Sequence, residues 1–144
     1  MQYWDTSTLA KLYVSEPDSA QFAAYLAATG PVTTSALARW ELFRVLARKE
    51  AEGALRIGAA EAIFAKFLAD ITAGVVALIP MDSPLETRFQ QLVLRLHRLN
   101  PPLLARTLDG IHIATADLHG ADALVATDTN MRKCAVAIGL RLYP

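Results

Sequence analysis

Four acidic residues of the 144-residue sequence lie within or directly after apolar segments, whereas most of the other acids lie in polar stretches. Asp5 ends the short apolar stretch that opens the chain, and Asp128 follows a second such stretch. Asp109 and Glu41 lie inside longer, largely apolar segments. If folding brought these carboxylates together, each pair at about 4 Å would repel by roughly 4 kcal/mol at an effective dielectric of ~20. Such a group must be protonated, be balanced by Lys or Arg, or bind a hard divalent cation.

The sequence favours the cation among these three possibilities. No Lys or Arg stands directly beside Asp5, Asp109 or Asp128, and so we expect no basic side chain to balance them. Carboxylate oxygens suit Mg²⁺ or Mn²⁺ better than Zn²⁺, whose usual Cys and His ligands are scarce here. Each acid taken alone also has a structural interpretation. Asp5 and Asp128 can be turn or cap residues, Asp109 a first-turn helix acid, and Glu41 half of a surface pair with an arginine three or seven positions on.

Short apolar runs alternate along the chain with segments of helical periodicity, as is typical of a parallel sheet between helix layers. We expect strands at residues 2–5, 32–33, 75–79, 123–126 and 140–143. We expect helices at 6–14 with Thr6 or Ser7 as N-cap, from Pro17 to Gly30, from a cap at Thr34 or Ser35 to Gly53, from there to Thr72, from Ser83 to before Asn100, over 107–119, and over 130–138. The predicted fold class is α/β, a three-layer α/β/α sandwich with a short central parallel sheet. Ligands of such sheets bind at the carboxyl ends of the strands, where Asp5 and Asp128 would lie.

Composition and length restrict the class of protein further. A chain of 144 residues with 53% hydrophobic residues is predicted to be one folded domain, residues 1–144, and not a disordered chain. Its one cysteine, Cys134, excludes a disulfide framework and a cysteine-based zinc site. The N-terminal residues do not resemble a signal peptide, and no apolar run approaches the ~20 residues of a membrane span. We therefore expect a cytoplasmic protein.

The charge balance bears on nucleic-acid binding. The sequence has 14 Lys+Arg and 14 Asp+Glu, a formal net charge of +0, whereas nucleic-acid-binding proteins usually show a basic excess. If the four acids hold a cation, however, the remaining acids are outnumbered by the basic residues, and the rest of the surface is mildly basic. Arg39 and Arg44, close in sequence to Glu41, are candidates to hold the phosphates of a nucleic acid.

Four segments of the sequence match the motifs of a known family. They are residues 3–9, with an Asp followed by Thr and Ser; the segment around Glu41; residues 108–116, the most telling; and residues 125–131. In order, spacing and total length they resemble the PIN-domain ribonucleases, and within these the VapC-type toxins of bacterial and archaeal toxin–antitoxin pairs. The resemblance covers essentially the whole chain. Gly110 departs from it, because the family often has Ala there; we expect the glycine only to loosen the start of the helix.

The resemblance implies a PIN-like fold and an endoribonuclease that depends on Mg²⁺ or Mn²⁺, in which a metal-activated water attacks the RNA phosphodiester. The metal ligands and catalytic residues that it implies are Asp5, Glu41, Asp109 and Asp128. Ser7 and Thr127 would support these carboxylates by hydrogen bonding. The resemblance also implies a homodimer and a cognate antitoxin protein that covers the helices between residues 35 and 72.

Other interpretations stay open at this point. His112 lies one helical turn after Asp109 on an apolar segment, and we interpret it as a hydrogen-bonded core residue, with orientation toward the site as the alternative. The function could instead be that of a non-catalytic PIN-like module that binds RNA or protein, or of a nuclease acting on DNA. A haloacid-dehalogenase-like phosphoaspartate hydrolase using Asp5 is a further alternative, but that chemistry expects a second Asp two positions on, where this sequence has Ser7.

Overall fold

Five parallel strands form one sheet at the centre of the molecule, and a computed structural model describes all residues, 1–144. The strands are β1 (Gln2–Trp4), β2 (Val32–Ser35), β3 (Val76–Ile79), β4 (Ala123–Val125) and β5 (Leu142–Tyr143). Their order across the sheet is β3-β2-β1-β4-β5. The chain thus builds outward from β1 to β3 and then returns to the other side of β1 to form β4. The topology switches between β1 and β4, which is where parallel sheets of this kind bind ligands.

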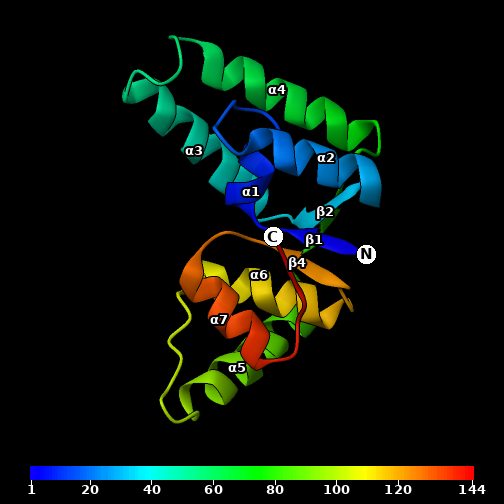
Figure 1. Cartoon of the computed structure of the whole chain (residues 1–144), viewed down its shortest axis with the longest axis vertical. Helices are drawn as coiled ribbons and strands as arrows, with labels where there is room; N and C mark the ends of the chain where they lie inside the picture. Colours follow the sequence, from blue (N-terminus) through cyan, green and yellow to red (C-terminus); the bar gives the residue numbers. More distant parts are fainter.

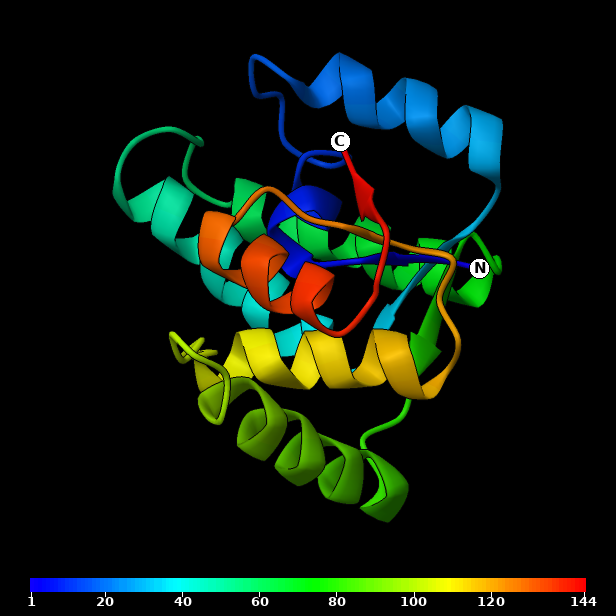
Figure 2. The same ribbon diagram turned by 60° about the horizontal axis from the view of Figure 1, so that its bottom comes forward.

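Seven helices cover the sheet, and their bounds are α1 (Thr6–Ala10), α2 (Ser19–Thr29), α3 (Ala38–Ala51), α4 (Ala59–Thr72), α5 (Ser83–His97), α6 (Thr107–Leu118) and α7 (Thr129–Ala137). Helices α1 to α4 lie on one face and α5 to α7 on the other, so that the predicted three-layer α/β/α arrangement is confirmed (Figure 1). Figures 1 and 2 both show α5 and α6 side by side in the second layer. None of these helices combines the length and the apolar character that a crossing of the bilayer requires.

Strand β1 joins the two hydrophobic cores of the molecule. Successive side chains of a strand point to opposite faces of the sheet. Tyr3 therefore packs into the core against α5, α6 and α7, and Trp4 packs into the core against α1 to α4. Both side chains are fully buried. Because the strand is covered on both faces, both Tyr3 and Trp4 are apolar core residues, and only Gln2 before them is partly exposed.

The first helix differs from the prediction at both ends. Its N-cap is Asp5, not Thr6 or Ser7, because the Asp5 carboxylate accepts a hydrogen bond from the Thr8 backbone N–H at 2.8 Å. The helix ends at Ala10, and turns continue the chain toward Val14. Asp5, which directly follows β1, is thus the N-cap of α1 and also lines a polar hollow at the end of this strand.

The start of α3 also differs from the prediction. Thr34 and Ser35 do not cap the helix; they continue β2, where they pair with Leu78 and Ile79 of β3. The helix begins at Ala38 after Leu37, which has no side-chain cap. The pairing of β2 with β3 extends this strand beyond the two residues that the local sequence predicts.

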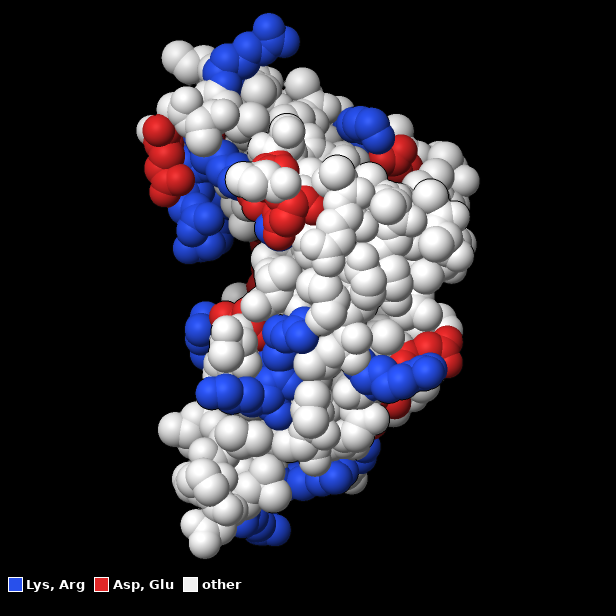
Figure 3. Space-filling view, in the orientation of Figure 1, with Lys and Arg blue, Asp and Glu red and all other residues white.

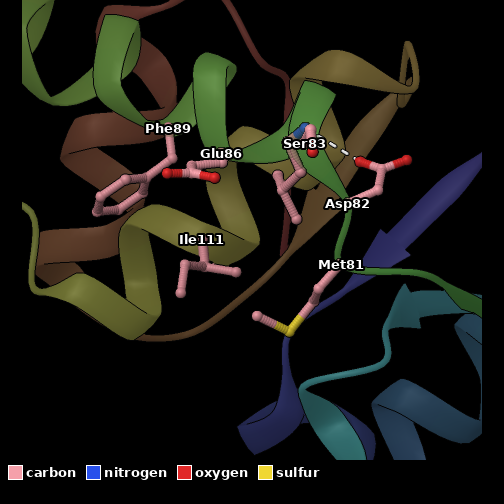
Figure 4. A pocket seen from close by; sticks show the side chains of 7 residues that line it. Met81, Asp82, Ser83, Glu86, Phe89 and Ile111 are labelled. Atoms are coloured by element: carbon pink, nitrogen blue, oxygen red, sulfur yellow. Dashed lines mark hydrogen bonds between the residues drawn. The ribbon is translucent and has the colours of Figure 1, made fainter.

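The contact between α5 and α6 requires Gly110. A Cβ atom added at Gly110 would lie 2.8 Å from Cε2 of Phe89, which is closer than nonbonded carbon atoms normally come. Figure 4 shows the two helices at this point, with Phe89 of α5 and Ile111 of α6 lining a largely apolar hollow. The glycine thus provides space for the aromatic ring, in addition to the expected loosening of the helix start.

We expect Gly110→Ala to lower the free energy of unfolding by about 1 kcal/mol. Alanine gains up to ~1 kcal/mol of helix propensity, but overpacking costs roughly 1–3 kcal/mol. Urea unfolding of Gly110→Ala, Phe89→Leu and the double variant measures the coupling between the two positions. The smaller leucine should offset part of the alanine cost. A Gly110→Ala protein that is more stable than the parent would show that the ring moves aside freely.

Candidate active site

The four singled-out carboxylates line one hollow of about 560 Å³ at the carboxyl edge of the sheet. Asp5 directly follows β1 and Asp128 follows β4, on the two strands between which the topology switches. Glu41 comes from the first turn of α3 and Asp109 from the first turn of α6. Each helix layer therefore contributes to the hollow. Figure 3 shows the molecule hollowed between its two helix layers, with basic side chains on both sides.

Asp5 is the most deeply buried acid of the group, with 3% of its surface exposed. Besides the cap bond from Thr8, its two oxygens lie 2.8 and 3.0 Å from the Ser7 hydroxyl, which donates to them. Burial raises the pKa of Asp5 above its ordinary value, and the hydrogen bonds from Thr8 and Ser7 offset this only in part. The carboxylate is thus held in one orientation in a place where a negative charge is costly without a cation.

Asp109 has a buried carboxylate oxygen without a hydrogen-bond partner, Oδ2. Burial raises the pKa of Asp109, and the negative charges of Asp128 and Asp5 raise it further, against the opposing charge of Arg106. Buried polar atoms without partners are uncommon, since each costs free energy. An oxygen in this state beside two other carboxylates is therefore well suited to ligate a cation.

Asp128 both caps a helix and lines the hollow. One carboxylate oxygen accepts the backbone N–H of Met131 at 2.8 Å and so caps α7. The other lies 3.4 Å from Nη2 of Arg106, whose Nε lies 3.7 Å from Oδ2 of Asp109. The expectation that no basic side chain balances these acids is therefore wrong. Arg106 side-chain exposure is 69%, and an ion pair so open to solvent is weak.

Glu41 is held by hydrogen bonds from the opposite helix layer and from α1. Its Oε2 atom lies 2.7 Å from Nε2 of His112 and accepts a hydrogen bond from the Thr6 hydroxyl at 2.5 Å. Burial would raise the pKa of Glu41, but these hydrogen bonds and the nearby charge of Arg44 hold it below its usual range. Glu41 forms no ion pair with Arg44 or Arg48, so it is not half of a helix-surface pair.

The other predicted site residues divide into two groups. Ser7 and Arg44 line the hollow with the carboxylates. Thr127 lines a neighbouring hollow beside Arg132 and makes no hydrogen bond to the four acids, and Arg39 is exposed on α3 outside both hollows. His112 is 2% exposed and hydrogen-bonded, so its interpretation as a hydrogen-bonded core residue is confirmed, yet it also borders the hollow.

Sequence reasoning did not assign Arg106 or Thr6 as a partner of the carboxylates. Arg106 stands three positions before Asp109, a spacing at which side chains at the start of a helix meet, and that signal could have found it. Thr6 was interpreted only as a helix cap. Its contact with Glu41 joins residues 35 positions apart and is not visible in local spacing.

The donor set of the hollow consists of oxygen atoms and fits Mg²⁺ or Mn²⁺. No group of three or more His, Cys, Asp or Glu side chains has the arrangement needed to ligate one metal ion. Mg²⁺ commonly takes one or two carboxylates and completes its shell with water. Asp109 and Asp5 fit this role best, because Asp109 has a buried oxygen without a partner and Asp5 is the most deeply buried of the four acids, whereas Glu41 is engaged by His112 and Thr6.

The family of the chain follows from comparison with known proteins. Residues 3–137 match the family model described as the PIN domain. The chain is 36% identical to Ribonuclease VapC46 of Mycobacterium tuberculosis (strain ATCC 25618 / H37Rv) over 140 residues, which are 96% of this chain and 92% of that protein. The chain thus belongs to the PIN-domain family. Within this family the chain is a homologue of the VapC ribonucleases.

Solved structures agree with this fold. FitAcB from Neisseria gonorrhoeae matches with a TM-score of 0.74 at 19% identity, over 100% of this chain and 97% of that one. VapBC2 from Rickettsia felis, bound to a DNA fragment from its promoter, matches with a TM-score of 0.69 at 17% identity, over 99% and 98%. The family assignment also removes the haloacid-dehalogenase-like alternative for Asp5.

Proposed function

We propose that this VapC-type PIN-domain protein is a Mg²⁺- or Mn²⁺-dependent endoribonuclease and the toxin of a type II toxin–antitoxin pair. The observation that carries the proposal is the convergence of Asp5 and Asp109 on one hollow. Both carboxylates have a pKa raised by burial, and one of them has a buried oxygen without a partner. The free-energy cost of this arrangement is explained if the two carboxylates serve a cation.

The residues of the hollow can be assigned roles in phosphodiester cleavage. Asp5 and Asp109 would hold the cation, with Asp128 and Glu41 contributing directly or through water. When bound, the cation supplies positive charge that lowers the pKa of a water and stabilises charge on the leaving oxygen. Glu41, whose pKa is lowered, is ionised at neutral pH and can accept a proton from the attacking water. Ser7 holds Asp5 in place.

The test is cleavage of single-stranded RNA by the purified protein in Mg²⁺, in Mn²⁺ and in EDTA, with single-stranded DNA of the same sequence alongside. The proposal expects cleavage of RNA only, and only with metal. It expects Asp109→Asn to remove cleavage and Asp122→Asn to leave it intact, because Asp122 precedes β4 at the opposite edge of the sheet. Cleavage in EDTA, or by Asp109→Asn, would contradict the proposed mechanism. RNA binding without cleavage would favour the non-catalytic alternative.

A homodimer and an antitoxin are the proposed partners. Large apolar side chains are exposed on and after α3, including Trp40 at 66% and Ile57 at 94%. Exposed apolar groups that gather in one region commonly mark protein interfaces. Light scattering of the purified protein should give twice the chain mass, and a small protein encoded beside it should co-purify and inhibit cleavage. A monomer would contradict the dimer.

Arg44 is the better of the two candidates for holding RNA. It lines the hollow, whereas Arg39 does not. We expect Arg44→Gln to raise the KM for RNA by up to ~5-fold at low salt, because an exposed ionic contact contributes up to about 1 kcal/mol. The effect should shrink as salt is added, and Arg39→Gln should have a smaller one. Steady-state kinetics at several salt concentrations measure both; an unchanged KM at low salt would remove the role.

A further inference from the structure

A chain of buried hydrogen bonds connects the centre of the sheet to Glu41. The backbone N–H of Ser35 in β2 donates to the Tyr3 hydroxyl oxygen at 3.1 Å. That oxygen lies 2.7 Å from Nδ1 of His112, and Nε2 of His112 lies 2.7 Å from Oε2 of Glu41. Tyr3 is fully buried and His112 is 2% exposed. The chain thus crosses from β2 through β1 and α6 to α3.

The chemistry of the groups fixes the direction of this chain. The ionised Glu41 carboxylate can only accept, so Nε2 of His112 carries a proton. The Ser35 N–H can only donate, so the Tyr3 oxygen accepts from it and the Tyr3 proton is available for Nδ1 of His112. A neutral imidazole that accepts at Nδ1 carries its proton at Nε2. His112 then donates from Nε2 to Glu41. Each bond in the chain has one donor and one acceptor.

The same carboxylate oxygen of Glu41 receives a second donor. The Thr6 hydroxyl donates to Oε2 at 2.5 Å, in addition to His112. The other oxygen, Oε1, has no hydrogen-bond partner and is not among the buried unpartnered atoms. Oε1 is therefore the one oxygen of Glu41, a lining residue of the hollow, that no protein group occupies.

We infer that Tyr3 and His112 are positioning residues that hold Glu41 by Oε2 and so present Oε1 alone to the reaction. This inference rests on the proposed nuclease function, and it assigns a task to two buried side chains. Without the Tyr3 hydroxyl, Nδ1 of His112 has no donor, and only Glu41 itself favours a proton at Nε2. In the other tautomer an unprotonated Nε2 would face the carboxylate, and Glu41 would lose this restraint. Residues that orient a ligand or catalytic group typically affect activity about 10- to 100-fold.

The variants are chosen to separate positioning from general stability. Tyr3→Phe removes only the hydroxyl, His112→Leu removes the donor, and His112→Gln keeps an N–H donor on a side chain of similar reach. Tyr13→Phe is the matched control, because its hydroxyl donates to Asp70 at 2.8 Å away from the hollow. Thermal unfolding of every variant reports the purely structural cost.

We expect Tyr3→Phe and His112→Leu to lower kcat by about 10-fold with the KM for RNA nearly unchanged. His112→Gln should recover most of the loss, and Tyr13→Phe should keep the parent kcat. In a Glu41→Gln background, Tyr3→Phe should have no further effect on kcat, because both changes act on one group. An unchanged kcat in Tyr3→Phe, or an equal loss in the Glu41→Gln background, would overturn the inference.

A spectroscopic measurement decides the same point without RNA or metal. Nitrogen-15 NMR distinguishes the two histidine tautomers, and the chain has only three histidines. The inference requires His112 to be protonated at Nε2 in the parent, with a shift toward the other tautomer in Tyr3→Phe. A proton at Nδ1 in the parent would overturn it. If the parent cleaves no RNA, the proposed function fails, and the tautomer still decides whether the chain of bonds runs as inferred.

Discussion

Asp5→Asn should abolish RNA cleavage and, in the absence of metal, raise the melting temperature of the protein. Asparagine keeps an oxygen that can accept the Thr8 N–H, so the cap of α1 survives. It removes a buried carboxylate whose pKa is raised by burial, and so it removes the cost of ionising that group. The loss of cleavage should exceed ~100-fold, beyond the range of groups that only orient a ligand.

Single-turnover cleavage and a thermal melt in EDTA measure the two effects on the same sample. Asp122→Asn, at the far edge of the sheet, is the control for cleavage and should retain activity. A variant that is inactive because it is unfolded would show a lower melting temperature, which is the opposite of the expected result. Full activity in Asp5→Asn would exclude Asp5 from the reaction.

In the absence of metal, Asp5 and Asp109 should lower the stability of the folded parent protein in a pH-dependent way. The Asp5→Asn, Asp109→Asn double variant should lack this effect. The pKa of each carboxylate lies above its ordinary value of 3.8, chiefly because of burial. The folded state therefore holds these protons more tightly than the unfolded chain does. The two groups therefore favour folding when the pH is below their pKa in the unfolded chain. This contribution to stability is lost as the pH rises through their pKa in the folded protein.

The gap in melting temperature between the double variant and the parent isolates this effect from the other acids. Several of these, such as Glu16 and Asp70, have a lowered pKa, so their contribution to stability is present at higher pH and is lost as the pH falls. In EDTA, the double variant should be the more stable at pH 7, and the gap should close as the pH falls toward 4. Mg²⁺ at pH 7 should raise the melting temperature of the parent alone, because it binds the folded state. A gap that widens in acid would contradict the assignment.

The sheet and the four acids could be predicted from the sequence because their signals are local. Apolar runs such as residues 75–79 contrast with their surroundings, and Asp5 and Asp128 each end such a run. The parallel arrangement then places strand ends on one edge, whatever the separation along the chain. The same local patterns do not determine where α1 begins, since Asp5, Thr6 and Ser7 are all good caps.

The contacts within the site could not be predicted, because they depend on packing between distant elements. The bond between Glu41 and His112 spans 71 positions and requires α3 and α6 to meet across the carboxyl edge of the sheet. The space for the Phe89 ring at Gly110 depends on how closely α5 approaches α6. Thr127, placed among the supporting residues by its neighbour Asp128, turns out to line a different hollow.

The strand order has a consequence for a chain that is still being synthesised. The first three strands emerge early and carry Asp5 and Glu41, but Asp109 and Asp128 belong to the final quarter of the chain. Until β4 emerges, one edge of β1 has no neighbour and the hollow has only one of its two walls. A nascent chain that still lacks β4 therefore cannot assemble the carboxylate hollow.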